Sequence, residues 1–145
     1  MTLLFPGSFD PFTIAHKDIA ERALNICDKL IIAVGINTAK TPTFDLQYRL
    51  DMINRAFIGE QKAVVCSYNI LTADFAYEQG VDAIIRGIRS PQDAEYEKPI
   101  AEFNRANYGI ETLFMYSRPE LEYISSSLVR ELYKLDKDIK PYLPA

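Results

Sequence analysis

Short apolar segments alternate with amphipathic segments along the whole chain, and this alternation constrains the fold more than any other feature of the sequence. The apolar segments are short and partly β-branched, as strands are, and cover residues 2–5, 30–36, 63–67, 83–86 and 112–116. The amphipathic segments have helical spacing; the first begins at about His16, and the others cover residues 46–57, 71–79, 100–107 and 126–135. The sequence therefore predicts an α/β fold with a doubly wound, parallel, five-stranded sheet that helices cover on both faces.

The chain has 145 residues, the usual size of one domain, and we expect residues 1–145 to form a single domain. Residues 136–145 contain two prolines and are expected to pack as irregular structure. No segment approaches the roughly 18 continuous apolar residues of a membrane span, and the N-terminus lacks the pattern of a signal peptide. We therefore expect a cytoplasmic protein in which Cys27 and Cys66 stay reduced.

Charge and strand ends together indicate what the chain can bind. A net charge of −4 disfavours broad binding to nucleic acid or to an anionic membrane, so neither is expected as a partner. In a parallel sheet the carboxyl ends of the strands share one edge, and ligands bind there. Polar or cationic residues follow every predicted strand at this edge: His16, Lys40, Thr72, Arg86 and Ser125. The sequence therefore favours an anionic small molecule bound at this edge.

Residues 6–16 are typical of a phosphate-binding turn, because a Pro- and Gly-rich turn leads from the first strand into a helix. His16, the one histidine of the chain, can donate a hydrogen bond to a phosphate there, and Ser8 can donate its hydroxyl. Asp10 is expected to brace the turn by bonding its own backbone. The alternative is a histidine with its hydrogen bonds satisfied inside the protein. One imidazole does not make a metal site, so no protein ligands for a metal are expected.

Arg86, Gly87 and Arg89 place two guanidinium groups beside a glycine that lets the backbone approach a ligand. These arginines suit phosphate binding, and the alternative is an ion pair with one of three acidic residues that follow: Asp93, Glu95 or Glu97. Lys40 is a weaker candidate, because a lysine in a loop is usually just solvated.

Ser125, Ser126 and Ser127 follow the last strand, where Ser125 suits the N-cap of a helix. Three hydroxyls beside the N–H groups of a helix start also suit a triphosphate, and both interpretations can hold together. Arg130 lies one turn into this helix and can reach either the phosphates or the surface.

Four segments together resemble the bacterial phosphopantetheine adenylyltransferases: residues 6–16, 85–89, 95–97 and 124–130, in the order and at the spacing of that family. The resemblance spans nearly the whole chain and implies a Rossmann-like nucleotidyltransferase fold. It also implies transfer of AMP from ATP, with magnesium, to 4'-phosphopantetheine, which gives dephospho-coenzyme A and pyrophosphate. The family is typically a homohexamer inhibited by coenzyme A, so both properties are expected here.

The resemblance assigns roles by position in the sequence. It implies catalytic roles for His16, Lys40 and Arg89, and binding of the acceptor substrate by Ser8, Lys40, Thr72 and Arg86. The residues that it implies for ATP binding are Ser8, Phe9, His16, Gly87, Ile88, Arg89, Glu97, Leu121, Glu122, Tyr123, Ile124, Ser125, Ser126 and Ser127.

Several positions depart from the family pattern: Ile14 stands where asparagine is frequent, Ser8 where threonine is frequent, and Thr72 at a position that is often apolar. Two further departures concern the backbone. Ala15 stands where the family commonly has glycine, which would be strained if the position required a positive φ. Pro99 falls within a helical pattern, so the helix is expected to begin near Lys98 or to be kinked. The alternatives to the adenylyltransferase are a related enzyme, such as a cytidylyltransferase or a nicotinamide mononucleotide adenylyltransferase, and a nucleotide-binding sensor that has lost catalysis.

Overall fold

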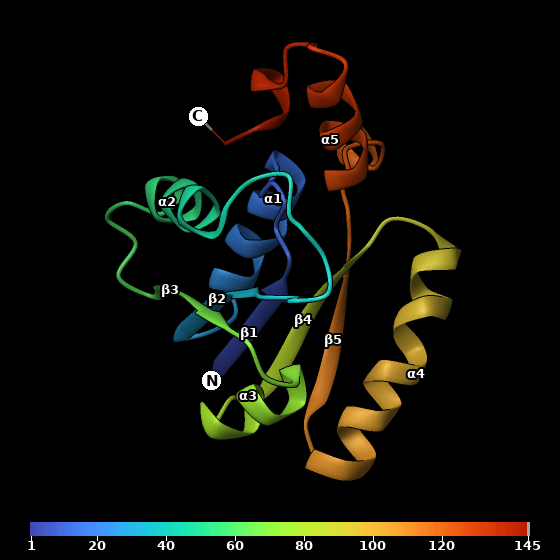
Figure 1. Cartoon of the computed structure of the whole chain (residues 1–145). Coiled ribbons are helices and arrows are strands. Elements are labelled where there is room, and N and C mark those ends of the chain that lie inside the picture. The colour runs from blue at the N-terminus through green and yellow to red at the C-terminus, as the bar shows by residue number, and fades with distance from the viewer. Residues whose placement is uncertain (145) are drawn as a thin grey trace.

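Five parallel strands form one sheet in the order β3–β2–β1–β4–β5 in the computed structural model, which describes residues 1–144 (Figure 1). The strands are β1 (Thr2–Gly7), β2 (Lys29–Gly35), β3 (Ala63–Tyr68), β4 (Ala83–Ile88) and β5 (Glu111–Tyr116). Each predicted strand is present, and its bounds differ from the prediction by at most two residues at either end. The predicted doubly wound α/β sheet is therefore confirmed.

Helices cover both faces of the sheet, because successive strand residues point to opposite sides. Leu3 and Phe5 share one core cluster with side chains of α1 (Ile14–Leu24) and α2 (Leu46–Ala56). Leu4 lies in the other cluster, beside side chains of α3 (Thr72–Glu78). The long helix α4 (Pro91–Tyr108) packs along β5, and α5 (Ser126–Lys134) lies beyond the carboxyl ends of the strands (Figure 1).

The chain order reverses at β1, which has β2 on one side and β4 on the other. At such a point the two neighbouring loops leave in opposite directions and open a crevice beyond the carboxyl ends of the strands. The loops after β1, β2 and β4 and the start of α5 surround this end of the sheet (Figure 1). The topology therefore gathers the loops that carry most of the predicted site residues around one crevice.

The first helix begins at Ile14, two residues before the predicted start, because Thr13 caps it. The Thr13 side chain accepts a hydrogen bond from the backbone N–H of His16, and the His16 ring accepts one from the backbone N–H of Thr13. Ala15 is consequently an ordinary helical residue and does not need a positive φ. Among residues 1–144, the non-glycine residues with positive φ are Phe9 (46°) and Asp136 (57°).

The helix that contains Pro99 begins at Pro91, so the expectation of a start near Lys98 is wrong. Ser90 caps the helix by accepting a hydrogen bond from the Asp93 N–H, and Pro91 fits the first helical position, where no backbone donor is needed. Pro99 removes one interior hydrogen bond, but α4 continues as one helix to Tyr108. A long helix with a capped start tolerates this loss because its other turns pack on the sheet.

The C-terminal segment is mostly irregular, as predicted, but it contains one 3-10 turn at Lys140–Tyr142. Leu143 packs against the core cluster that contains α1, which anchors this segment to the sheet. A second 3-10 turn, Pro119–Leu121, precedes α5. None of the helices within residues 1–144 combines the length and the apolar character needed to span a bilayer.

Candidate functional site

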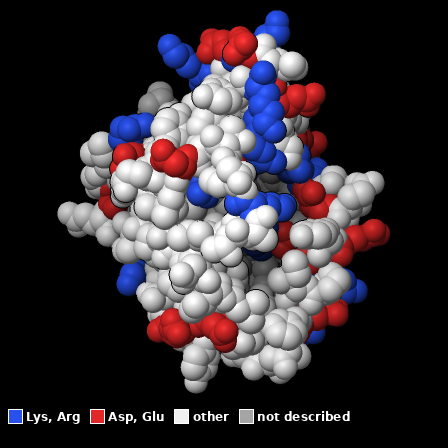
Figure 2. All heavy atoms as spheres, viewed as in Figure 1, with Lys and Arg blue, Asp and Glu red and all other residues white. Residues whose placement is uncertain are grey.

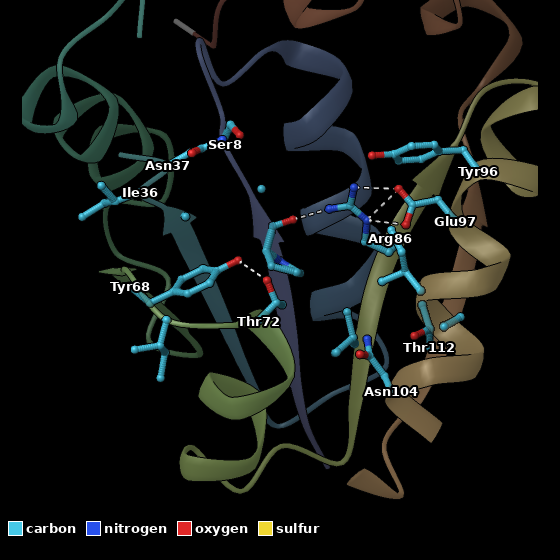
Figure 3. A pocket seen from close by; sticks show the side chains of 17 residues that line it. Ser8, Ile36, Asn37, Tyr68, Thr72, Arg86, Tyr96, Glu97, Asn104 and Thr112 are labelled. Carbon is cyan, nitrogen blue, oxygen red and sulfur yellow. Dashed lines mark hydrogen bonds and ion pairs between the residues drawn. The ribbon is translucent and has the colours of Figure 1, made fainter. Parts of the chain in front are cut away.

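Two cavities meet at the carboxyl end of the sheet. The first, of about 290 Å³, is named the His16 cavity; Phe9, His16, Arg89 and the serines 125–127 line it. The second, of about 330 Å³, is named the Asn104 cavity, and its lining includes Tyr68, Thr72, Glu97, Asn104 and Thr112 (Figure 3). Both cavities share Ser8 and Arg86. A group bound between Ser8 and Arg86 would therefore contact ligands in both.

His16 presents one defined ring nitrogen to its cavity. The backbone N–H of Thr13 donates to Nδ1 across 3.0 Å, so Nδ1 is the acceptor and Nε2 carries the ring proton. Burial, together with the nearby guanidinium groups of Arg86 and Arg89, lowers the pKa of His16 to about 3. The imidazole is therefore neutral near pH 7 and has a single N–H to donate.

Two aromatic rings fix the position of the His16 ring. Phe12 stacks on it with a centroid separation of 5.4 Å, and Phe9 meets it edge-on at 5.1 Å. Phe9 adopts a φ of 46°, a conformation that costs energy for a non-glycine residue and that concentrates at functional sites. Phe9 as a whole is 4% exposed, so its ring belongs to the core and packs against His16.

Arg86 is paired with Glu97 on one wall of the Asn104 cavity, as one of the alternatives in the sequence analysis expected. The Arg86 Nε lies 3.2 and 3.1 Å from the two Glu97 carboxylate oxygens, and Nη2 lies 2.7 Å from Oε1 (Figure 3). Arg86 Nη1 also donates to the Pro6 carbonyl across 2.6 Å. The guanidinium group of Arg86 is thus held in one orientation. Glu97 contacts this group and lines the Asn104 cavity.

Arg89 also has an acidic partner, but a weaker one. Its Nε lies 3.4 Å from Asp93 Oδ2; the Arg89 side chain is exposed and that of Asp93 is partly exposed, so this pair contributes little stability. Gly87 lines the His16 cavity, and a Cβ at this position would approach Ile19 to 3.3 Å. Ile88 is 2% exposed and lies in the core, so only its backbone is available to a ligand.

The three serines after β5 are already engaged within the protein. Ser125 caps α5 by accepting from the Leu128 N–H, as the sequence predicted. Ser126 Oγ donates to the Pro11 carbonyl across 2.8 Å, and Ser127 Oγ accepts from Arg130 across 3.1 Å. The hydroxyls therefore position the helix start, which lines the His16 cavity and whose first N–H groups have no partner in the helix backbone. Ile124 lines this cavity. The three residues that precede Ile124 do not line it: Leu121, Glu122 and Tyr123.

Arg130 points toward the opening turn. Its Nη1 donates to the Asp10 carbonyl across 2.9 Å, and its side chain lines the His16 cavity. The sequence left open whether Arg130 reaches toward the phosphates or toward the surface, and the structure favours the first of these.

Asp10 braces a different segment from the one predicted. Its carboxylate accepts from the backbone N–H groups of Thr43 and Phe44, at 2.9 and 2.8 Å, and so ties the loop that carries Lys40 to the opening turn. Sequence reasoning missed this contact because the partners lie 33 and 34 residues away. It also missed Arg49, which is 5% exposed and donates to the Ser8 carbonyl across 2.8 Å. A lone arginine in a helix gave no signal of this role.

Lys40 lines neither of the two cavities. It borders a third cavity of about 520 Å³, which Ser8, Asp10 and Arg130 connect to the others. Thr72 does line the Asn104 cavity, where its hydroxyl lies 2.8 Å from the Tyr68 hydroxyl (Figure 3). Tyr68, Asn104 and Thr112 were not identified from the sequence, because each is an isolated polar residue on its strand or helix.

Positive charge gathers around the crevice although the chain is acidic. Lys40, Arg86, Arg89 and Arg130 all line these cavities. Figure 2 shows Lys and Arg side chains in a column that descends from the α5 end toward the middle of this face. Within the part of the chain that the structure describes, no group of three or more His, Cys, Asp and Glu side chains is arranged to hold a metal ion. The site is therefore suited to an anion with several phosphates.

Comparison with known sequences gives consistent matches over the whole chain. Residues 4–132 match the family model described as cytidylyltransferase-like. A phosphopantetheine adenylyltransferase of Phocaeicola vulgatus is 45% identical over 141 residues, which are 97% of this chain and 93% of that protein. A phosphopantetheine adenylyltransferase of Cytophaga hutchinsonii is 44% identical over 142 residues, covering 97% of this chain and 95% of that protein.

Comparison with solved structures supports the fold. A nicotinic acid mononucleotide adenylyltransferase of Plasmodium falciparum, complexed with NaAD, superposes with a TM-score of 0.65 at 16% identity, over 98% of this chain and 89% of that one. A bifunctional NMN adenylyltransferase/ADP ribose pyrophosphatase of Francisella tularensis, complexed with AMP and a manganese ion, gives a TM-score of 0.68 at 16% identity. That match covers 99% of this chain but only 44% of the bifunctional protein. At this identity the similarity concerns the fold, which is that of Rossmann-like nucleotidyltransferases.

Proposed function

The chain belongs to the phosphopantetheine adenylyltransferase family, and from this premise we propose that its two adjoining cavities hold the two substrates of one transfer reaction. Enzymes of this family transfer AMP from ATP to 4'-phosphopantetheine and release pyrophosphate, and the chain is such an enzyme. The observation that carries the assignment of the cavities is that both share Ser8 and Arg86. The reacting phosphates of the two substrates would meet there.

ATP binds in the His16 cavity in this proposal. The start of α5 directs N–H groups and a positive helix end at the triphosphate, and Arg89 and Arg130 line the same space. His16 offers the Nε2 proton as a hydrogen-bond donor, and its low pKa keeps the ring in this neutral form. Phe9, Gly87 and Ile88 contribute through the backbone or by packing.

The acceptor binds in the Asn104 cavity. Its phosphate lies against Ser8 and Arg86, and its arm extends between Thr72 and the side of α4 that faces the cavity. Lys40 approaches from the third cavity, and the bonds from Asp10 to Thr43 and Phe44 hold its loop near Ser8. Glu97 supports this binding indirectly, because it holds the guanidinium group of Arg86 in place.

The reaction needs positioning and charge stabilisation and no covalent nucleophile from the protein. An oxygen of the acceptor phosphate attacks the α-phosphorus of ATP, a new P–O bond forms, and the bond to pyrophosphate breaks. Negative charge concentrates on both phosphates during this step, so Arg86, Lys40 and the His16 N–H stabilise it electrostatically. Arg89 and the start of α5 hold the leaving pyrophosphate.

Magnesium enters as part of the nucleotide substrate. Because the described residues provide no cluster of metal-ligating side chains, the ion would be held by phosphate oxygens and water rather than by a protein cage. Magnesium neutralises the triphosphate in such a complex.

The assay that tests this function measures pyrophosphate release from ATP and magnesium with different acceptors. We expect release only when 4'-phosphopantetheine is added. Release with nicotinamide mononucleotide or glycerol phosphate would assign the chain to a related nucleotidyltransferase. Binding of ATP by calorimetry without turnover on any of these acceptors would indicate a sensor.

Assembly and regulation are expected from the family resemblance. The exposed apolar side chains of α4 and β5, among them Ile100, Phe103 and Phe114, provide a surface for contacts between subunits of a homohexamer. Coenzyme A contains the acceptor arm and an adenylate, so it would compete for both cavities. Sedimentation tests whether the protein is a hexamer. Inhibition by coenzyme A, measured at several ATP concentrations, tests the competition for the cavities.

A further inference from the structure

Arg49 of α2 is a buried arginine without an acidic partner. It is 5% exposed and forms no salt bridge with any of residues 1–144. Two carboxylates, those of Asp10 and Asp45, line the third cavity with Arg49, but they accept hydrogen bonds from backbone N–H groups instead. A buried charge without a counter-charge costs stability. The presence of Arg49 is therefore better explained by what its guanidinium group binds than by stability alone.

The guanidinium group of Arg49 binds backbone carbonyls. Its Nη1 donates to the Ser8 carbonyl across 2.8 Å, and its Nε lies 3.4 Å from the carbonyl of Asp45, the cap of α2. Ser8 follows β1 directly and lines all three cavities, whereas Arg49 lines the third one alone. Arg49 therefore holds the opening turn from the side of the third cavity.

Other carbonyls of the opening turn are also held by side chains from distant elements. The donors lie in β4 and α5, and the bonds run from Arg86 to Pro6, from Arg130 to Asp10 and from Ser126 to Pro11. These three donors line the His16 cavity and Arg49 does not, so Arg49 is the donor of this set that acts from outside that cavity. A carbonyl oxygen repels a phosphate, so a turn whose carbonyls are bound to donors is suited to an anion.

The bond from Arg49 bears directly on the backbone of Phe9. The Ser8 carbonyl and the Phe9 N–H belong to one trans peptide, so they point in opposite directions. Half a turn of this peptide would change the φ of Phe9 from its strained value of 46° to a negative value and would exchange the places of the carbonyl and the N–H. Among residues 1–144 the Phe9 N–H has no hydrogen-bond acceptor. Arg49 therefore holds a strained peptide whose N–H is free for a ligand.

We propose that Arg49 is a positioning residue for the transfer reaction, because its bond to the Ser8 carbonyl keeps the Phe9 N–H directed at the phosphates in the His16 cavity. Ser8 and Phe9 both line that cavity. Without the bond the peptide can turn over and present a carbonyl oxygen to the phosphates instead. This inference rests on the proposed function, which places the reacting phosphates beside Ser8.

Arg49→Met tests the role by kinetics, because methionine is also long and unbranched but donates no hydrogen bond. The kcat should fall about 10- to 100-fold through the lost orientation of one N–H donor. The KM for each substrate should stay within about threefold of wild type, because Arg49 contacts neither substrate in this proposal. Arg49→Lys keeps a cationic donor, so its kcat should lie well above that of Arg49→Met. Arg55→Met, at an exposed arginine of the same helix, is the matched control and should behave as wild type.

NMR observes the peptide itself. Ser8–Phe9 is the one Ser–Phe pair of the sequence, so protein labelled with carbonyl-13C serine and 15N phenylalanine gives a single signal from this peptide. Without substrate, the signal should move in Arg49→Met and stay in place in Arg55→Met. In wild type, ATP with magnesium should shift the Phe9 amide proton downfield, and this response should be lost in Arg49→Met. A merely structural role of Arg49 would leave the response to ATP unchanged.

Four results would overturn the role of Arg49. They are a kcat of folded Arg49→Met equal to that of wild type, a rise in KM without a fall in kcat, an equal kcat in Arg49→Lys and Arg49→Met, and a wild-type Phe9 amide that does not respond to ATP. The last of these decides the question if Arg49→Met does not fold. If wild type releases no pyrophosphate with 4'-phosphopantetheine, the proposed function fails by itself. An unmoved Ser8–Phe9 signal in substrate-free Arg49→Met would reject the inference independently of turnover.

Discussion

The backbone N–H of Thr13 lies 3.0 Å from Nδ1 of His16 and donates a hydrogen bond to it, which fixes the tautomer of the ring. The same two residues form the cap of α1, so the structure that starts the helix also orients the imidazole. The fold thereby prepares a neutral N–H donor at the end of β1, where the phosphates of a nucleotide would lie.

The titration of His16 follows from this geometry. The ring should stay neutral in the substrate-free protein from pH 8 down to about 5, because its pKa is lowered to about 3. An unfolded chain takes up the proton below about pH 6.5, so the contribution of His16 to stability is present above that pH and is lost as pH falls toward 3. The one histidine of a tag-free protein gives one set of NMR ring signals to follow. A midpoint near 6.5 would contradict the burial argument.

His16→Ala should lower kcat by about 100- to 1,000-fold, because in the proposed function it removes a hydrogen-bond donor to the reacting phosphates. The change also removes one side of the helix cap, so a loss of about 1 kcal/mol in the free energy of unfolding is expected. Circular dichroism should show that the variant is folded at the assay temperature. Lys17→Ala is the matched control, since Lys17 is the next residue of α1 and pairs with Glu21 on the helix surface. Near-normal turnover of His16→Ala would remove the residue from the mechanism.

Glu97→Gln should affect the acceptor more than the nucleotide. Glutamine keeps the shape of the side chain but loses the charge-assisted bonds that hold Arg86, so the acceptor KM should rise about tenfold with little change in the ATP KM. Glu102→Gln, on the exposed surface of α4, serves as the control. A rise confined to the ATP KM would instead support direct contact of Glu97 with ATP, as the family resemblance implies.

Ala15→Gly should destabilise the protein even though it restores the residue that is common in the family. Ala15 is helical and 8% exposed, so glycine adds backbone freedom to the unfolded chain and removes a buried methyl group. We expect the free energy of unfolding to fall by about 1 kcal/mol in urea titrations. A gain in stability would show that Ala15 is strained in the native protein.

The strand and helix patterns of the sequence predict the sheet and the edge at which the candidate site lies. Strand and helix patterns are local in the sequence, and in a parallel α/β fold the carboxyl ends of the strands share one edge. The sequence alone therefore predicts that His16, Arg86 and Ser125 lie near one another. The cap at Ser125 was predictable for the same reason, because capping involves residues three positions apart.

How these side chains are held depends on packing between segments that are distant in the sequence. The bonds from Asp10 to Thr43 and Phe44, the pair of Arg86 with Glu97, and the bond from Arg49 to the Ser8 carbonyl depend on loop paths and on the packing of α2 and α4. Such contacts join residues distant in sequence, and no periodicity or short motif encodes their distances. The local pattern therefore predicts the edge of the sheet at which the candidate site lies, and the packing between distant segments sets which atoms are available there.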